Sequence, residues 1–227
     1  MIKLDKVSKT FLTGSIAISD VTLSVDKGEF VFLIGETGSG KTTLFRLLIR
    51  EFLPSKGSII VADFDVVKLP GHKIPNLRKK VGVIFQDLKL LLDRTIFENI
   101  VLPLEVVGMS AKDAIKRVEE VMEDVEISEH RDKFPIQLSG GELQRVAIAR
   151  SLVLSPEILL ADEPTGNLDP TTSKDIVKLL QAINKKGTTI IMATHNADIV
   201  NYYPTRVVTM SKGKVARDQK KGKYDAS

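Results

Sequence analysis

The sequence GETGSGKTT, residues 35–43, decides the fold of this chain. It follows an apolar run, FVFLI at residues 30–34, and precedes Leu44, Leu47 and Leu48, which recur at helical spacing. A short apolar run that ends at a glycine is typical of a buried parallel strand. The pattern G-x-x-x-x-G-K-[ST] between such a strand and a helix predicts a phosphate-binding loop. We therefore expect an α/β domain that binds a nucleotide.

The residue types in this loop suit a triphosphate. Glycines let the loop wrap with its amides pointing inward, where a side chain would block a phosphate. The start of the next helix adds positive potential, Lys41 reaches the terminal phosphates, and the Thr42 hydroxyl suits Mg²⁺. The expected nucleotide-binding residues of the loop are Gly35, Glu36, Thr37, Gly38, Ser39, Gly40, Lys41, Thr42 and Thr43.

Two carboxylates end a second apolar run, ILLADE at residues 158–163. In open α/β sheets ligands bind at the carboxyl ends of strands, so Asp162 and Glu163 are expected to face the phosphate loop. Asp162 suits Mg²⁺, and Glu163 suits orienting or deprotonating an attacking water. The plainer alternative is a pair of acids that opens a loop.

A second glycine-rich motif, LSGGELQR, spans residues 138–145 and precedes a predicted helix. Its exposed amides, its hydroxyl and the helix dipole would all favour an anion. An ordinary N-cap by Ser139 is the alternative interpretation. Because the chain already has one phosphate loop, a second anion site suggests that it serves the ATP of another copy.

The remaining pattern outlines the domain. Residues 2–11 and 18–25 alternate around a turn and predict antiparallel strands. Strand patterns return at 157–161 and 188–194 with a helix between them, and a hairpin is expected around 211–213. Between these parts lies a helix-rich section. Its clearest helix, residues 110–126, begins with a capping-box pattern at Ser110 and Asp113 and has one apolar face, formed by Ile115, Val118, Met122 and Val125.

Composition sets limits on the function. The 227 residues are 43% hydrophobic and 27% charged, which is ordinary for a globular domain. A net charge of +4 does not indicate a nucleic-acid partner. The chain has no cysteine, and no run approaches the roughly 18 apolar residues of a membrane span. The charged N-terminus is unlike a signal peptide, so we expect a cytoplasmic protein.

Taken together, these motifs resemble those of the nucleotide-binding subunits of ABC ATPases. The resemblance rests on GETGSGKTT, Gln86, LSGGELQR, ILLADE, GNLD at residues 166–169 and the histidine of ATHN. It implies one ABC ATPase domain over 1–227: a P-loop α/β core with a mainly parallel sheet, an N-terminal antiparallel β region and an inserted α-helical lobe. The ATP-binding core lobe would span 1–86 and 158–227, and the helical lobe 87–157.

The resemblance also implies an ATPase that uses Mg²⁺ and closes as a head-to-tail dimer on two ATP molecules. Thr42, Gln86 and Asp162 would hold the metal, and Gln86, Glu163 and His195 would act in hydrolysis. Asp169 would contact the opposite site. Phe11 would stack on adenine, with a core aromatic as the alternative. The residues implied to contact the ATP of the partner copy are Ser139, Gly140, Gly141 and Glu142.

The stretch FQDLKLLLDRTIFENI, residues 85–100, resembles the cell-division branch of this family. That branch implies an integral membrane subunit as partner, and thus a location on the inner face of the membrane. The expected docking residues are Leu88, Leu90, Leu91, Arg94 and Glu98. An ATPase of a lipoprotein or macrolide exporter is the alternative. A nucleotide-gated scaffold with little turnover is another, and Glu163 argues against it.

The end of the chain is rich in lysine and arginine, at positions 212, 214, 217, 220, 221 and 223. Such a segment favours weak contact with anionic lipid. A solvated tail explains the same residues equally well.

Overall fold

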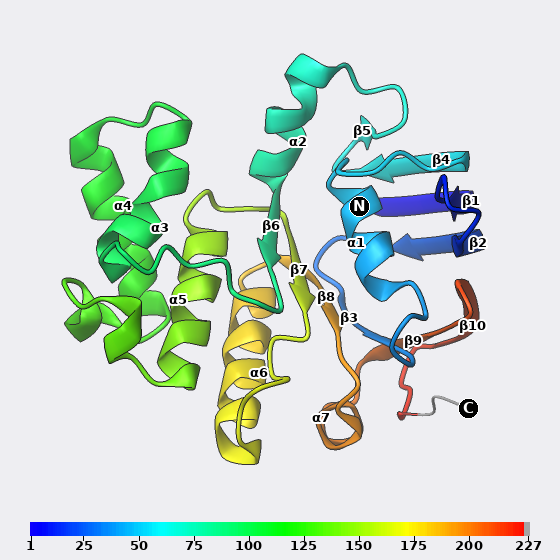
Figure 1. The fold of residues 1–227 in the computed structure, drawn as a ribbon. Coiled ribbons are helices and arrows are strands. Elements are labelled where there is room, and N and C mark those ends of the chain that lie inside the picture. Colours follow the sequence, from blue (N-terminus) through cyan, green and yellow to red (C-terminus); the bar gives the residue numbers. More distant parts are fainter. Residues whose placement is uncertain (225–227) are drawn as a thin grey trace.

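A six-stranded sheet lies at the centre of the molecule. The computed structural model describes residues 1–224 (Figure 1). The strand order is β10-β9-β3-β8-β7-β6, in which β10 is antiparallel to β9 and the other neighbours are parallel. The bounds are β3 (Phe30–Ile34), β6 (Val81–Ile84), β7 (Ile158–Asp162), β8 (Thr189–Ala193), β9 (Arg206–Ser211) and β10 (Lys214–Gln219).

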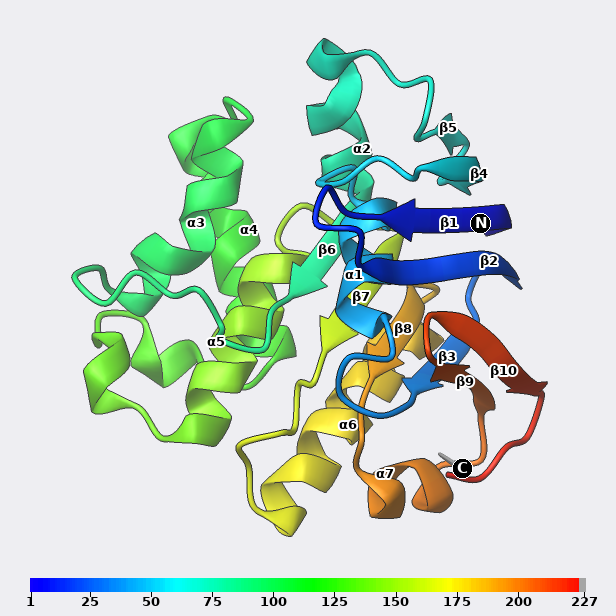
Figure 2. The same cartoon turned by 45° about the vertical axis from the view of Figure 1, so that its right-hand side comes forward.

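A four-stranded antiparallel sheet covers one side of this centre, in the order β2-β1-β4-β5. It consists of β1 (Ile2–Thr10), β2 (Ile16–Val25), β4 (Lys56–Val61) and β5 (Phe64–Asp65). In both overall views it lies apart from the green helices, with the central sheet between them (Figures 1 and 2). The predicted N-terminal antiparallel region is therefore confirmed.

Helices fill both faces of the central sheet because its strands are apolar on both sides. Residues 31 and 33 of β3 pack with α1 (Lys41–Leu48) and the antiparallel sheet. Residues 30, 32 and 34 pack with α6 (Pro170–Lys185) in a second cluster that continues into the helical lobe. Two smaller helices are α2 (Ile74–Lys80) and α7 (Ala197–Tyr202). Within residues 1–224, no helix has the length and apolar character to cross a membrane.

The helical lobe contains α3 (Ile96–Val106), α4 (Ala111–Asp124) and α5 (Gly140–Leu152), at the left of Figure 1. Short 3-10 turns lie at Gly71–Lys73, Ser128–His130 and Pro135–Gln137. Residues 85–157 contain no strand. The lobe boundaries at 87 and 157 stay a prediction.

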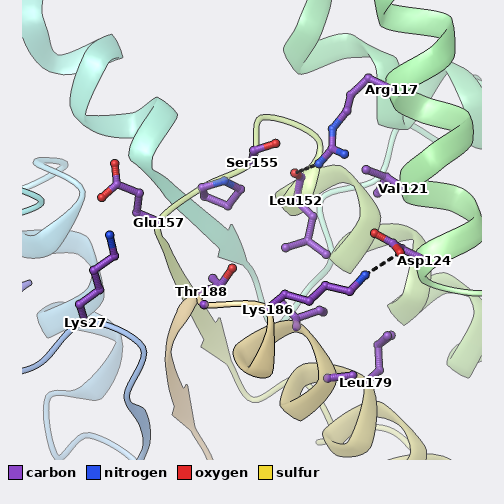
Figure 3. Close-up of a pocket in the computed structure, with 14 residues that line it drawn as sticks. Lys27, Arg117, Val121, Asp124, Leu152, Ser155, Glu157, Leu179, Lys186 and Thr188 are labelled. Carbon is purple, nitrogen blue, oxygen red and sulfur yellow. Dashed lines mark hydrogen bonds and ion pairs between the residues drawn. The ribbon is translucent and has the colours of Figure 1, made fainter.

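Charged side chains join the helical lobe to the core around a hollow of about 430 Å³ (Figure 3). Lys186 Nζ, beyond the end of α6, lies 2.7 Å from Asp124 Oδ1 at the end of α4. Arg117 of α4 donates to the carbonyls of Leu152 and Val153, which end α5. Cations at helix C-termini are stabilising because the helix dipole is negative there. The Lys186–Asp124 pair thus joins α6 to α4, and Arg117 joins α4 to the end of α5.

The structure corrects some details of the sequence-based expectations. Ile115 was expected on the buried face of α4, but it is 41% exposed, and Ala114 is buried in its place. The basic end of the chain is not simply a tail, because residues 214–219 form β10. Its lipid contact stays a prediction. The sequence patterns do not indicate five elements, β4, β5, α2, β6 and α7, and they place α3 only within a helix-rich section.

The packing of α4 makes a testable contrast. Met122→Ala should lower the free energy of unfolding by about 2–5 kcal/mol, because it leaves a cavity in the core. Ile115→Ala on the same helix should cost about 1 kcal/mol or less. Chemical denaturation measures both. Equal losses would show that Ile115 belongs to the core after all.

Candidate functional site

The path of the phosphate loop depends on glycines that lie very close to the backbone of other segments. Gly35 has a φ of 146°, and a Cβ there would lie 2.2 Å from the carbonyl oxygen of Met210. Gly40 has a φ of 107°, and its Cβ would lie 2.7 Å from the Ala17 carbonyl oxygen. Only glycine fits such positions. The loop is thus wrapped against the core at both ends, with α1 beginning directly after it.

Lys41 and Thr42 lie at the start of α1. Lys41 is buried and donates to the carbonyl oxygens of Gly35 at 2.7 Å and Glu36 at 3.1 Å. Thr42 Oγ1 donates to Asp162 Oδ2 at 2.9 Å, which joins the loop to the end of β7. Burial raises the pKa of the Asp162 carboxyl; the Thr42 hydrogen bond opposes this shift.

Glu163 and His195 form a pair beside the loop. His195 Nδ1 lies 2.9 Å from Glu163 Oε1, and the His195 amide donates to Glu163 Oε2 at 3.4 Å. Glu163 follows β7 and has a φ of 51°, which is uncommon for a residue other than glycine. Its amide donates to the Ala193 carbonyl of β8. This turn directs the carboxylate toward His195 and the loop.

Predicted residues from four distant segments meet around one hollow of about 250 Å³, although Gly35, Glu36 and Ser39 of the loop are not in its lining. Gln86, which is exposed beyond the end of β6, belongs to this lining. The parallel strands explain the meeting, because their carboxyl ends share one edge of the sheet. The hollow is lined by Ala17, Thr37, Gly38, Gly40, Lys41, Thr42, Thr43, Gln86, Asp162, Glu163 and His195.

Phe11 is not part of that lining. Its half-buried ring meets Phe52 edge-on with centroids 5.4 Å apart, and Lys9 Nζ lies 5.3 Å from the Phe11 centroid. Phe11 is not among the buried core side chains of the described residues. The structure therefore favours a surface aromatic over a core aromatic, and stacking on adenine stays a prediction.

The signature motif lies at a separate hollow of about 390 Å³. Ser139 is the N-cap of α5 and accepts from the Glu142 amide at 3.4 Å. A Cβ on Gly141 would lie 2.6 Å from Thr172 Cγ2, so α5 closely approaches α6 here. Asp169 lines the same hollow and caps α6 by accepting from the amides of Thr171 and Thr172. Hydrogen bonds, chiefly from Thr172, lower the pKa of Asp169.

The segment after Gln86 is anchored to α3. The Asn99 side chain, fully buried, accepts from the Leu91 amide at 2.8 Å and donates to the Leu91 carbonyl at 3.0 Å. It also donates to the carbonyls of Arg94 and Thr95. Glu98 forms a capping box with Thr95 and pairs with Arg94 at 3.4 Å. One buried side chain thus holds the loop that precedes α3.

A second anchor comes from the last turn of α5. Arg150 donates to the carbonyls of Leu88 at 2.5 Å and Lys89 at 2.6 Å. Both of these residues have positive φ, 54° and 53°. Leu88 and Leu90 are half-buried against the core cluster, whereas Leu91 is exposed. Of the five predicted docking residues, two leucines therefore support the core, and Leu91, Arg94 and Glu98 lie nearer the surface.

Comparison with known proteins identifies the family. The ABC transporter family model matches residues 18–166. The cell division ATP-binding protein FtsE of Mycobacterium tuberculosis is 50% identical over 226 residues, which cover 99% of this chain and 98% of that protein. The chain is an ABC ATPase of the FtsE family. The FtsE proteins of Bacillus subtilis and Escherichia coli are 44% and 43% identical, over 99% and 94% of this chain and 98% and 96% of theirs.

Solved structures agree with the ABC ATPase fold. A dimeric ATP-binding cassette in a post-hydrolysis state, bound to ADP and Pi, is 33% identical with a TM-score of 0.88. The two structures overlap over 99% of this chain and 100% of that cassette. The predicted ABC ATPase fold is therefore confirmed.

Sequence reasoning assigned no role to Asn99 or Arg150. Asn99 lies beside the buried Ile96 and Ile100 at helical spacing. A polar residue on an apolar helix face is a signal of a satisfied buried hydrogen bond, and it would have identified Asn99. Arg150 left no comparable signal, because its acceptors are backbone carbonyls about 60 residues earlier in the chain.

The anchoring role of Asn99 is testable. Asn99→Ala should lower the free energy of unfolding by about 2–4 kcal/mol, because it leaves buried backbone groups without partners. Hydrogen exchange at the Leu91 amide should accelerate. Arg94→Ala, which removes only an exposed ion pair, should cost about 0.5 kcal/mol. Unchanged exchange at Leu91 in Asn99→Ala would refute this role.

Proposed function

We propose that this ATPase closes as a head-to-tail dimer on two ATP molecules and transmits the movement to an FtsX-like integral membrane subunit. The supporting observation is that the two halves of an ATP site lie in separate hollows. The phosphate loop lines one hollow and the signature with Asp169 lines the other, with no residue in common. A head-to-tail pair would bring the signature of one copy to the ATP held by the other.

The first hollow suits the triphosphate of ATP. Within residues 1–224 the Lys41 ammonium is bound only by loop carbonyls, so it can move onto the terminal phosphates. The amides at the start of α1 add positive potential. In this arrangement residues 35–43 bind the phosphates, and the Phe11 ring faces the base.

The residues present fit Mg²⁺. The Thr42 hydroxyl and the Asp162 carboxylate lie 2.9 Å apart, and the Gln86 side chain lines the same hollow. Oxygen ligands of these kinds are the ones that Mg²⁺ prefers. We propose that Thr42, Gln86 and Asp162 hold the ion, which when bound neutralises charge on the β- and γ-phosphates.

Glu163 and His195 are the proposed hydrolytic residues. The Glu163 carboxylate is held at the edge of the hollow by the His195 side chain and amide. From there it would orient and deprotonate the attacking water. His195 would contact the γ-phosphate through its second ring nitrogen while it positions Glu163. Gln86, beyond the end of β6, would sense Mg²⁺ and the attacking water.

The proposed docking surface for the membrane subunit is a hollow of about 530 Å³ beside the segment after Gln86. The exposed apolar side chains Phe85 and Leu102 line it, and so does Arg150. Leu91, Arg94 and Glu98 would extend this surface along the same segment. Through this partner the ATPase would lie on the inner face of the membrane and control peptidoglycan hydrolases outside the cell.

The catalytic assignment is testable with Glu163→Gln. This variant should bind ATP, lose hydrolysis by about a hundredfold or more, and accumulate as an ATP-bound dimer. Gel filtration with ATP and a phosphate-release assay measure both effects. Adding Lys41→Ala should remove the ATP-dependent dimer, because the terminal phosphates lose their cation. Normal hydrolysis by Glu163→Gln would show that another group activates the water.

The docking assignment is testable by pull-down of the membrane subunit. Leu102→Glu and Leu91→Asp should each abolish capture and spare basal ATPase activity, since they place charge on an apolar contact. Ile136→Glu is the matched control: Ile136 is 90% exposed, belongs to the same lobe and lies outside the hollow. Capture that survives both Leu variants would place the docking surface elsewhere.

A further inference from the structure

Two α-helices of the helical lobe, α3 and α5, each begin with a capping box, and the two boxes have the same backbone geometry but different surroundings. In the box that opens α3, Glu98 caps Thr95 and pairs with Arg94 at the surface. In the box that opens α5, Glu142 Oε2 accepts from the Ser139 amide and from the Ser139 hydroxyl, each at 2.7 Å. The second box therefore occupies the hydroxyl that the proposed function assigns to the partner copy's ATP.

The free oxygen of Glu142 contacts a buried histidine. His130 is 6% exposed, and its Nε2 lies 3.0 Å from Glu142 Oε1. Its Nδ1 lies 3.0 Å from Lys133 Nζ. Glu129 is farther away, with Oε1 4.0 Å from Nε2. In the box at Thr95 the equivalent oxygen, Glu98 Oε1, pairs with an exposed arginine, whereas at α5 the partner is a buried histidine.

The two neighbours determine the proton arrangement of His130. A lysine ammonium can only donate, so Nδ1 accepts, and the neutral ring then has its proton on Nε2. That proton is donated to Glu142. Hydrogen bonds from Ser139, together with the hydrogen bond from His130, lower the pKa of Glu142, which favours the ionised carboxylate as the acceptor of the His130 proton.

The loop that carries His130 is itself fixed. The carbonyls of Arg131 and Lys133 accept from the amides of Phe97 and Ile96, the first residues of α3. The loop therefore joins the beginning of α3 through these carbonyls to the beginning of α5 through His130.

We propose that His130 is a positioning residue of the signature motif, an inference that rests on the head-to-tail dimer proposed above. By donating its Nε2–H to Oε1 it keeps the Glu142 carboxylate in place and offsets part of its negative charge. The Ser139 hydroxyl can then leave Oε2 and donate to the γ-phosphate of the partner copy's ATP. Without His130, Glu142 would keep the hydroxyl and present a less compensated negative charge to that phosphate.

The test uses the full chain with Glu163→Gln, titrated with ATP, and gel filtration to measure dimer formation. Adding His130→Leu should raise the ATP concentration for half-maximal dimer about tenfold, the scale of one hydrogen bond to a charged group. His130→Gln should restore dimer formation to within about threefold of the parent, because its amide can donate to Glu142 and accept from Lys133. His72→Leu, at an exposed histidine, should have no effect.

ADP binding by the monomer distinguishes a loss of Glu142 positioning from a general loss of folding. It uses the phosphate loop of the same chain, so it should be unchanged in every variant. Equal dimer formation by His130→Leu and the parent would overturn this inference alone, as would failure of His130→Gln to rescue. A parent that forms no ATP-dependent dimer would overturn the proposed function and this inference together. If His130→Leu fails to fold, His130→Asn takes its place, because the shorter Asn side chain cannot reach Glu142. Dimer formation by His130→Asn equal to that of the parent would overturn the inference.

Discussion

The parallel alignment of β3, β8, β7 and β6 is the constraint on which the site depends. Each strand ends at the same edge of the sheet, and residues at or after each of these ends line the hollow at the phosphate loop. The hydrogen bond from Thr42 to Asp162 joins two of these ends directly. Because the strands are buried on both faces, their positions are fixed by the two cores and not by the loops themselves.

The helix α5 links the signature to the segment after Gln86. Its first turn carries Ser139 as N-cap, and its last turn carries Arg150, which holds the carbonyls of Leu88 and Lys89. Thirteen residues of helix span about 20 Å, and a helix transmits movement along its axis as a rigid element. The single helix α5 could therefore carry the proposed movement from the ATP site to the surface that binds the membrane subunit.

Much of the fold followed from local patterns. The phosphate loop and its strands were predicted from the glycines of residues 35–43 and from the apolar runs before residues 35 and 162. These patterns are reliable because glycine permits the loop backbone and an apolar run favours a buried strand. The β6 strand was missed, since VGVI is too short to stand out from its basic flank. Ile115 was misplaced because helical spacing defines a face only to within about one residue, and packing chose Ala114.

The sequence by itself determined the chemistry: a phosphate loop, two acids after a strand, and a signature that suits an anion. Only the tertiary structure decided which side chains act through others. Asn99 and Arg150 bind backbone carbonyls, and His130 meets Glu142 across two loops. Every residue has the same backbone carbonyl, so no sequence pattern can mark the one that a side chain will bind. Such contacts exist only once packing brings the segments together.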